Sequence, residues 1–394
     1  MFKYLVSIFF LLFSLTNFAS AHTAGAPYDP FYSKLSSSEH LKQHYSEGDL
    51  RILIVPGHGK LTGGTSFGGL YERDLNVIIA DKLAKLLETN TNFKIYLARD
   101  LSGDYSSWLR AYMETGREAI LAFRTNAIKY YNSIKFSLPP SGQSVYHNTA
   151  SEQAAFELYA LNKFANDNRI DIALHIHIND YPRRNMSGPG EHVGFTVYVP
   201  DSNFANSQAS TDLASFMRDK FSRIIPVSTL PGENMGVTPD RELIAIGSNG
   251  SRDSAALLVE YGYIYESQIT SANASVRNMY FDLLANETYQ AIKSYFGYLP
   301  AEQAGQVTES GMSDYIFTRF LKRGMKSEPD VLALQIKLNK LGLYPPIGKT
   351  LRDCPITSNF GPCTEQSVKN FQVKNNLEQV GIVGPQTRAL LNLK

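Results

Sequence analysis

Two polar residues near the first strongly apolar segment have types and surroundings suited to catalysis or metal binding. His58 follows an apolar run, residues 51–55, within the tetrapeptide PGHG, and Glu72 opens an amphipathic helical pattern after a glycine-rich stretch. The flanking glycines permit unusual backbone dihedrals and let other groups come close to the imidazole. Each residue also has a plain structural explanation: His58 as an incidental residue of a turn, and Glu72 as a favourable charge in a first helical turn.

Two further polar segments lie later in the chain. In IDIALHIHIND, residues 170–180, strand alternation places His175 and His177 on the face opposite the isoleucines. In ALLVEYGYI, residues 256–264, Glu260 ends a strongly apolar run, where a carboxylate is unfavourable unless it faces a cleft, a metal ion or a partner. The alternation does not decide between the two histidines, and a buried salt bridge would also explain Glu260.

Together these residue types suit metal-assisted hydrolysis. Two histidines and one carboxylate, with a fourth position open, form a catalytic zinc site. Zinc lowers the pKa of bound water to around 7 and polarises a scissile carbonyl. A glutamate in a dry pocket nearby has the raised pKa that suits general acid/base work. We therefore expect Zn2+ as the cofactor.

The segments that would position these residues alternate between strand-like and helix-like patterns. Strand-like runs cover residues 51–55, 93–97, 170–178, 194–199 and 255–261, and helical patterns cover residues 72–87, 108–131, 152–166, 209–224 and 276–296. This alternation predicts an α/β fold with a mostly parallel sheet flanked by helices. Open sheets of this kind bind ligands at the carboxyl ends of their strands, which is where His58 lies.

Composition and targeting signals narrow the class of protein. The chain has 394 residues and a net charge of +1, which leaves room for one large and one smaller domain and gives no sign of nucleic-acid binding. A signal peptide is predicted over residues 1–21 from the basic Lys3, the apolar residues 5–15 and the small residues before His22. We expect an exported protein, periplasmic or secreted, with no membrane span after cleavage.

The remaining organisation follows from composition. We expect a polar N-terminal leader over residues 22–48, a catalytic domain over 49–297, a linker over 298–322 and a small all-α domain over 323–394. In the leader, His40 and His44 have the spacing of zinc ligands on one helix face. The segment reads HLKQH, however, and lacks the glutamate of the HExxH motif, so a solvated helix is expected there. The only cysteines, Cys354 and Cys363, predict a disulfide in an exported chain.

Four separated motifs resemble the zinc-dependent N-acetylmuramoyl-L-alanine amidases of bacterial cell-wall turnover. These are VPGHG, YERDLNVIIADKL, HIHIND and LLVEYGYI, and YLARD with Arg99 and GFTVYV at residues 194–199 also fit. The resemblance covers residues 50–297 and implies His58, Glu72 and His177 as zinc ligands, with Glu260 as the general acid/base. Aligned on its asparagine, HIHIND puts His175 where this family commonly has a serine. The long segment 101–169 departs from the family pattern and could act as a lid, an occluding helix or an extra substrate contact.

The C-terminal part resembles the small helical peptidoglycan-binding domain found beside many lytic enzymes. VLALQIKLNKLGLY, SNFGPCTEQSVKNFQVKNNL and GIVGPQTRALLN correspond to its three recurring pieces. The resemblance implies peptidoglycan as the partner, held weakly so that the local concentration of substrate rises. A helical tail that only packs against the rest of the chain is the alternative.

The sequence therefore predicts an exported two-domain amidase that hydrolyses the amide between the lactyl group of N-acetylmuramic acid and the L-alanine of the stem peptide. Two other functions remain open from the sequence alone. One is a zinc peptidase that cuts within stem or bridge peptides. The other is a wall-binding or regulatory protein without catalytic activity.

Overall fold

A six-stranded sheet forms the centre of the protein in a computed structural model that describes residues 37–60, 63–136, 138, 145, 147, 149–182, 184–185, 188–246, 253–297 and 315–393. The strands are β1 (Leu50–Pro56), β4 (Phe93–Leu97), β5 (Ile172–Asn179), β6 (Thr196–Pro200), β7 (Val237–Asp240) and β8 (Ala255–Tyr263). Their order in the sheet is β4-β1-β5-β8-β6-β7. In this order the first four strands, β4, β1, β5 and β8, are parallel, and β6 runs antiparallel to β8. The fold is therefore α/β with a mostly parallel sheet, as the sequence predicts.

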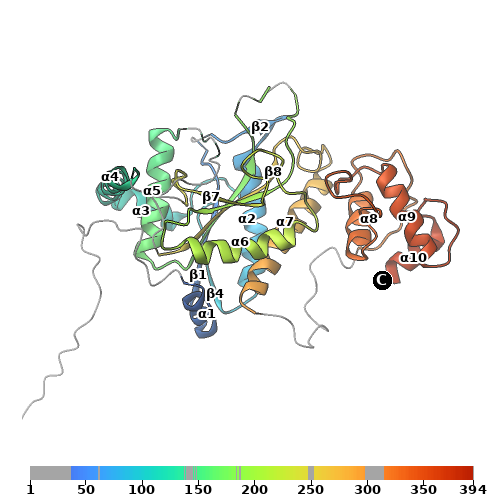
Figure 1. Ribbon diagram of the computed structural model, residues 1–394, viewed down its shortest axis with the longest axis horizontal. Coiled ribbons are helices and arrows are strands. Elements are labelled where there is room, and N and C mark those ends of the chain that lie inside the picture. Colours follow the sequence, from blue (N-terminus) through green and yellow to red (C-terminus); the bar gives the residue numbers. More distant parts are fainter. Residues whose placement is uncertain are drawn as a thin grey trace, which may run out of the picture.

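Helices cover both faces of this sheet, which explains why its central strands are apolar nearly throughout. On one face lie α2 (Glu72–Glu88), α6 (Ser207–Phe221) and α7 (Ala274–Tyr295); on the other lie α3 (Ser107–Thr115), α4 (Arg117–Ile134) and α5 (Glu152–Asp167). Figure 1 shows these two layers on either side of the strands. Along β1, Ile52 and Ile54 belong to the first face, whereas Leu53 and Val55 belong to the second.

Three details of the sheet and its connections were outside the sequence prediction. The helix expected over residues 108–131 is two helices, α3 and α4, separated at Gly116. A Cβ at Gly116 would lie 2.8 Å from the carbonyl oxygen of Tyr112, so the chain needs glycine there. A short hairpin of β2 (Ser66–Phe67) and β3 (Leu70–Tyr71) precedes α2. Within the described part of the long segment 101–169, α3 and α4 pack onto α5, and these three helices contribute to the second apolar face.

The N-terminal helix α1 (Ser38–Glu47) forms where the leader was expected to be helical, but it is not simply solvated. Ser37 caps its start and Gly48, with φ 75°, ends it. Leu41 is fully buried, and Tyr45 stacks on Phe296 with ring centroids 4.6 Å apart. The helix is therefore packed onto the main domain.

The C-terminal region is helical, as predicted. It consists of α8 (Pro329–Lys340), α9 (Pro362–Lys374) and α10 (Pro385–Leu393), seen at the right of Figure 1. Cys354 and Cys363 form the predicted disulfide. Helix α8 packs against α7, and Asn273 Nδ2 donates to the carbonyl of Ser327 at 3.1 Å across the same contact.

Three of the sequence predictions involve residues that are wholly or partly undescribed. The predicted signal peptide, residues 1–21, lies outside the described residues, as do residues 22–36 of the predicted leader and most of the predicted linker. In the described part of the chain, every helix is too short or too polar to cross a bilayer. At the end of the linker, Phe317 and Leu321 are buried, and Leu321 pairs with Val383 of the C-terminal region.

Candidate metal centre and acid/base glutamate

Three side chains from separate elements meet at the carboxyl ends of β1 and β5. His58 lies two residues after the end of β1, Glu72 is the first residue of α2, and His177 lies near the end of β5. His58 Nε2 lies 3.2 Å from Glu72 Oε2, and His177 Nδ1 lies 2.9 Å from Glu72 Oε1. One potential ligand atom from each of the three residues lies within 4.8 Å of the other two. The His58 side chain is 30% exposed, so solutes can reach the cluster.

Glycines make this convergence sterically possible. A Cβ on Gly57 would lie 2.1 Å from Cε1 of His177, and a Cβ on Gly64 would lie 3.0 Å from the His58 ring and 3.1 Å from Glu72 Oε2. His58 itself has a positive φ of 61°, a strained conformation that typically costs about 1–3 kcal/mol and concentrates at functional sites. The glycines of PGHG and of the following loop therefore leave room for the cluster.

Backbone and side-chain donors fix the position of Glu72. Its Oε2 accepts from the backbone N–H of Thr65 at 3.0 Å, and its Oε1 accepts from the backbone N–H of Ile178 at 3.3 Å. Asn76, one helical turn further along α2, donates from Nδ2 to Glu72 Oε1 and to the carbonyl of Gly57, each at 3.3 Å. These bonds connect α2 to the loop that carries His58 and to β5.

The buried guanidinium of Arg99 holds the loop from the other side. Its side chain donates to the carbonyls of Gly57 at 3.1 Å, Arg73 at 3.3 Å and Gly103 at 2.9 Å. Arg99 is only 1% exposed. It therefore joins the end of β1, the start of α2 and the loop after β4 into one unit.

The protonation states favoured by the cluster are those that metal ligands need. Burial alone would raise the pKa of Glu72, but the adjacent imidazoles of His58 and His177 outweigh burial and hold the pKa well below its usual value. Burial lowers the pKa of His177 despite the opposing effect of Glu72. An ionised carboxylate beside a neutral imidazole is the form in which both bind a divalent cation.

Glu260 lies beside this cluster on the neighbouring strand. It is opposite His177 in the β5–β8 register and opposite Thr196 in the β6–β8 register. Its Oε2 is buried and has no hydrogen-bond partner among the described residues. Burial, and then the negative charges of Glu72 and Glu233, raise the pKa of Glu260 well above its usual value. A carboxyl group with a raised pKa holds its proton more readily than an ordinary glutamate, which suits general acid/base work.

His175 has a different environment. It is 2% exposed, its Nδ1 has no hydrogen-bond partner in the described part of the chain, and burial lowers its pKa to about 3. It is not among the three residues whose ligand atoms cluster. The structure thus separates the two histidines that alternation left equivalent.

Two known domain families match separate parts of the chain. The family model for N-acetylmuramoyl-L-alanine amidase matches residues 52–294, which is more than half of the chain. The chain belongs to the N-acetylmuramoyl-L-alanine amidase family. The amidase is accordingly a hydrolase that acts on peptidoglycan, so its place of action is outside the cytoplasm. A second model, for a peptidoglycan binding domain, matches residues 327–391.

Solved structures similar to the amidase include three enzymes of the same class. The CwlD amidase from Clostridioides difficile is 17% identical with a TM-score of 0.41, and the match covers 63% of this chain and 98% of that one. Ami1 from Mycobacterium smegmatis is 16% identical with a TM-score of 0.39, covering 64% and 98%. An amidase from Nostoc punctiforme is 21% identical with a TM-score of 0.37, covering 63% and 97%. No curated protein sequence matches the chain.

Several residues that support the cluster were not foreseen from the sequence. Glu233 is 1% exposed, and its carboxylate accepts hydrogen bonds from Asn179, Tyr198, Ser228 and Tyr263. Its charge is one of those that raise the pKa of Glu260. Its sequence context, PGEN, has no apolar run that would mark a buried carboxylate. Asn76 did carry a signal, because it lies four residues after Glu72 on the same helix face.

Proposed function

We propose that this amidase is zinc-dependent, with His58, Glu72 and His177 as the ligands and Glu260 as the general acid/base. The observation that carries the proposal is the convergence of these three donors beside a buried carboxyl oxygen without a partner in the described residues. Two imidazole nitrogens and one carboxylate oxygen are the donor set of catalytic zinc sites. The room that Gly57 and Gly64 leave around the donors supports the same assignment.

The bond cleaved is the amide between the lactyl group of N-acetylmuramic acid and L-alanine. When bound, zinc supplies Lewis acidity, which polarises the carbonyl and lowers the pKa of water. Glu260 Oε2 accepts the proton of the attacking water and then donates it to the nitrogen of the departing L-alanine. Its raised pKa suits both steps, because it makes the carboxylate a stronger base toward water and lets the carboxyl group keep the proton until the leaving nitrogen takes it.

Positioning falls to the buried groups around the ligands. Asn76 and Arg99 hold the carbonyl of Gly57 and so fix the loop that carries His58. The backbone N–H groups of Thr65 and Ile178 keep both oxygens of Glu72 in place. Small displacements of reacting groups reduce rates strongly, so these residues contribute to turnover without touching substrate.

The test is digestion of purified sacculi by the mature, zinc-loaded chain, followed by mass analysis of the products. The amidase releases intact stem peptides and leaves glycan chains with free lactyl carboxylates. Products with cut stem or bridge peptides and intact lactyl amides would mean a peptidase. Absence of any product would mean a wall-binding protein without activity. Glu260→Gln, which keeps the size of the side chain, is the matched negative control and should release products at least about 100-fold more slowly.

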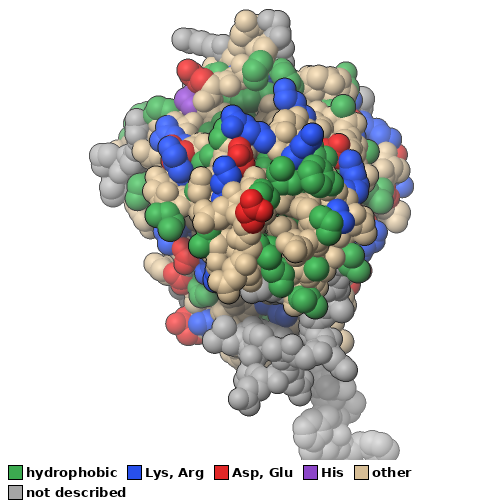
Figure 2. Space-filling model, turned by 90° about the vertical axis from the view of Figure 1, so that its right-hand side faces the viewer, with side chains coloured by type: hydrophobic (Ala, Val, Ile, Leu, Met, Phe, Trp, Pro, Cys, Tyr) green, Lys and Arg blue, Asp and Glu red, His purple; other side chains and the backbone are tan. Residues whose placement is uncertain are grey.

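We further propose that residues 323–394 bind peptidoglycan for an exported enzyme, periplasmic or secreted. On the face over the C-terminal helices, hydrophobic side chains are interspersed with Lys and Arg (Figure 2). A pocket in the C-terminal region includes the exposed apolar side chains of Ile347 and Val373 together with Lys374. Full-length protein with Ile347→Asp and Val373→Asp should pellet less with sacculi yet cleave a small soluble muropeptide at the wild-type rate. Equal loss of both activities would refute a separate binding role.

A further inference from the structure

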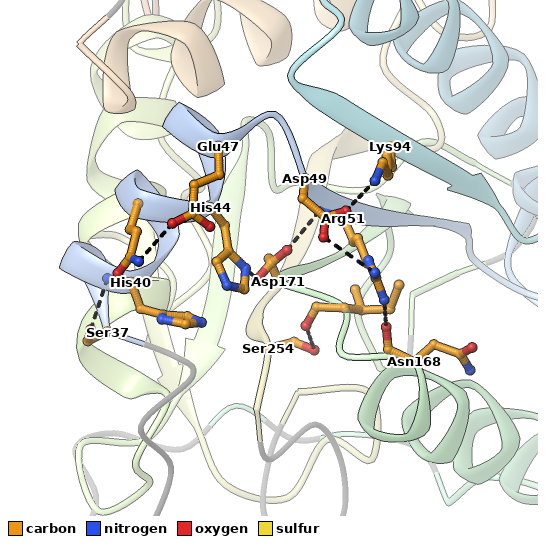
Figure 3. A network of polar contacts seen from close by, with 12 residues as sticks. Ser37, His40, His44, Glu47, Asp49, Arg51, Lys94, Asn168, Asp171 and Ser254 are labelled. Atoms are coloured by element: carbon orange, nitrogen blue, oxygen red, sulfur yellow. Dashed lines mark hydrogen bonds and ion pairs between the residues drawn. The ribbon is translucent and has the colours of Figure 1, made fainter. Parts of the chain in front are cut away.

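A second group of metal-type ligands lies away from the candidate catalytic centre. His40 and His44 project from one side of α1, which faces Asp171 at the start of β5 (Figure 3). One potential ligand atom from each of these three residues lies within 4.8 Å of the other two. We propose that His40, His44 and Asp171 bind a second divalent transition-metal ion of the zinc class.

The contacts within the group support this assignment. His44 Nδ1 lies 2.8 Å from Asp171 Oδ1, and the rings of His40 and His44 have centroids 4.0 Å apart. The Nε2 of His40 is buried and has no hydrogen-bond partner among the described residues. A buried imidazole nitrogen without a partner loses the hydrogen bond that water would give it. A metal ion shared with His44 and Asp171 would satisfy it.

Distances and donor chemistry indicate which ions fit. Ligand atoms about 2.1 Å from a tetrahedral zinc ion lie roughly 3.4 Å from one another. All three potential ligand atoms lie within 4.8 Å of one another, and the His44–Asp171 pair lies at 2.8 Å, so side-chain rotations would bring the three atoms around one ion. Two imidazoles and one carboxylate suit zinc or its late first-row neighbours, whereas calcium and magnesium prefer an all-oxygen shell.

The second group cannot share an ion with the first. Asp171 precedes β5, whereas His177 lies near its end. Six residues of extended strand separate them by about 20 Å. The His44 side chain is 25% exposed, so an ion can reach the site from solvent.

The site would have a structural role. Asp171 is only 3% exposed, and its Oδ2 accepts from the backbone N–H of Arg51 in β1 at 2.7 Å. A metal ion bound by Asp171 and both histidines would fasten α1 to the amino ends of β1 and β5. Structural zinc sites contribute their binding free energy to folding, so zinc should raise the thermal stability of the chain through this group.

The experiment measures zinc per chain and melting temperature in the full mature protein. Because the proposal is independent of the catalytic assignment, it is tested in a His177→Ala background, in which the catalytic group lacks a ligand. We expect this variant to retain about one zinc ion per chain and to melt at higher temperature when zinc is added. Adding His40→Ala should abolish both the bound zinc and the zinc-dependent rise. His40→Ala removes no hydrogen bond of the Nε2 atom, so the variant chain should fold.

His147 provides the matched control. Its Nε2 lies 2.8 Å from Asp240 Oδ2, with side-chain exposures of 21% and 5%, against 25% and 4% for His44 and Asp171. It is in neither candidate metal group. His147→Ala should therefore leave the zinc content and the zinc-dependent rise unchanged. If His177→Ala binds no zinc, or if His40→Ala leaves zinc content and melting as they were, the His44–Asp171 contact is a structural hydrogen bond only and the proposal is wrong.

Discussion

The most specific consequence of the structure concerns Gly57, the residue before His58. Replacing Gly57 by alanine places a methyl group 2.1 Å from Cε1, 2.3 Å from Nε2 and 2.6 Å from Nδ1 of His177. Ordinary van der Waals contact begins near 3.4 Å, so the two groups must separate by 3.4 − 2.1 = 1.3 Å. The backbone of residue 57 cannot easily yield that distance. Its N–H donates to the carbonyl of Ile176 at 2.8 Å, and its carbonyl accepts from Asn76 and Arg99.

The displacement therefore falls on His177. Moving this ring by about 1 Å disrupts the 2.9 Å contact of its Nδ1 with Glu72. Misplacement of about 1 Å in a catalytic arrangement can reduce the rate about 100-fold, and overpacking of this kind costs about 1–3 kcal/mol in stability. We expect Gly57→Ala to remain folded, to bind less zinc than the wild type and to lose at least about 100-fold in turnover.

The assay compares zinc content and turnover of a soluble muropeptide in Gly57→Ala and in a matched glycine variant. Gly188→Ala serves as the control, because a Cβ at Gly188 would meet nothing within 4 Å and that residue has no positive φ. It should behave as the wild type. If Gly57→Ala keeps wild-type zinc content and turnover, His177 is not held against Gly57 as a ligand, and the reasoning fails.

Three further predictions concern stability as well as activity. Because Glu260 has a raised pKa in the folded state, the metal-free chain loses stability as the pH rises above about 4.3, the ordinary pKa of glutamate. Glu260→Gln should therefore unfold at a higher denaturant concentration than metal-free wild type at pH 7, by a margin that shrinks toward pH 4, while its turnover falls about 100- to 10,000-fold. An equal margin at both pH values would contradict the assignment. Arg99→Ala removes charged hydrogen bonds to the carbonyls of Gly57, Arg73 and Gly103 and should lower the free energy of unfolding by at least about 3 kcal/mol, with partial recovery in Arg99→Lys. Denaturant titration would refute the role if both variants match wild type. Cys354→Ser opens the loop that the disulfide closes, whose ends are 9 residues apart in sequence. It should destabilise the C-terminal region by about 2–3 kcal/mol without changing cleavage of a soluble muropeptide. If the variant melts at the same temperature as the wild type under oxidising conditions, the disulfide contributes nothing to stability.

Two of the candidate ligands, His58 and Glu72, could be proposed from the sequence because each lies in a distinctive local pattern. His58 sits between two glycines after an apolar run, and Glu72 opens a helical pattern. Parallel strands carry such residues to a common edge of the sheet. The apolar runs of β1, β5 and β8 thus indicated both the fold and the approximate place of the site.

Other features depend on partners that lie far away in the chain. The reason for Gly57 is the ring of His177, and no short motif records that contact. His40 and His44 were expected to be solvated, because their third partner, Asp171, is 127 residues beyond His44. The antiparallel direction of β6 was likewise hidden, since a buried strand has the same apolar pattern in either direction.

The division of His175 and His177 shows what three-dimensional structure adds. Both lie on β5 and were equivalent by alternation. His177 contacts Glu72, whereas His175 lies further back along the strand, 2% exposed. Their positions along the strand distinguish the two residues, whereas alternation indicates only the face of the sheet on which a residue lies.

The most direct test of the account is a crystal structure of the zinc-loaded mature protein with anomalous diffraction recorded at the zinc edge. The account predicts an anomalous peak about 2.0–2.2 Å from His58, Glu72 and His177, with the Glu260 carboxyl group beside it. A peak bound by His175 in place of His177, or no zinc at these three side chains, would contradict it.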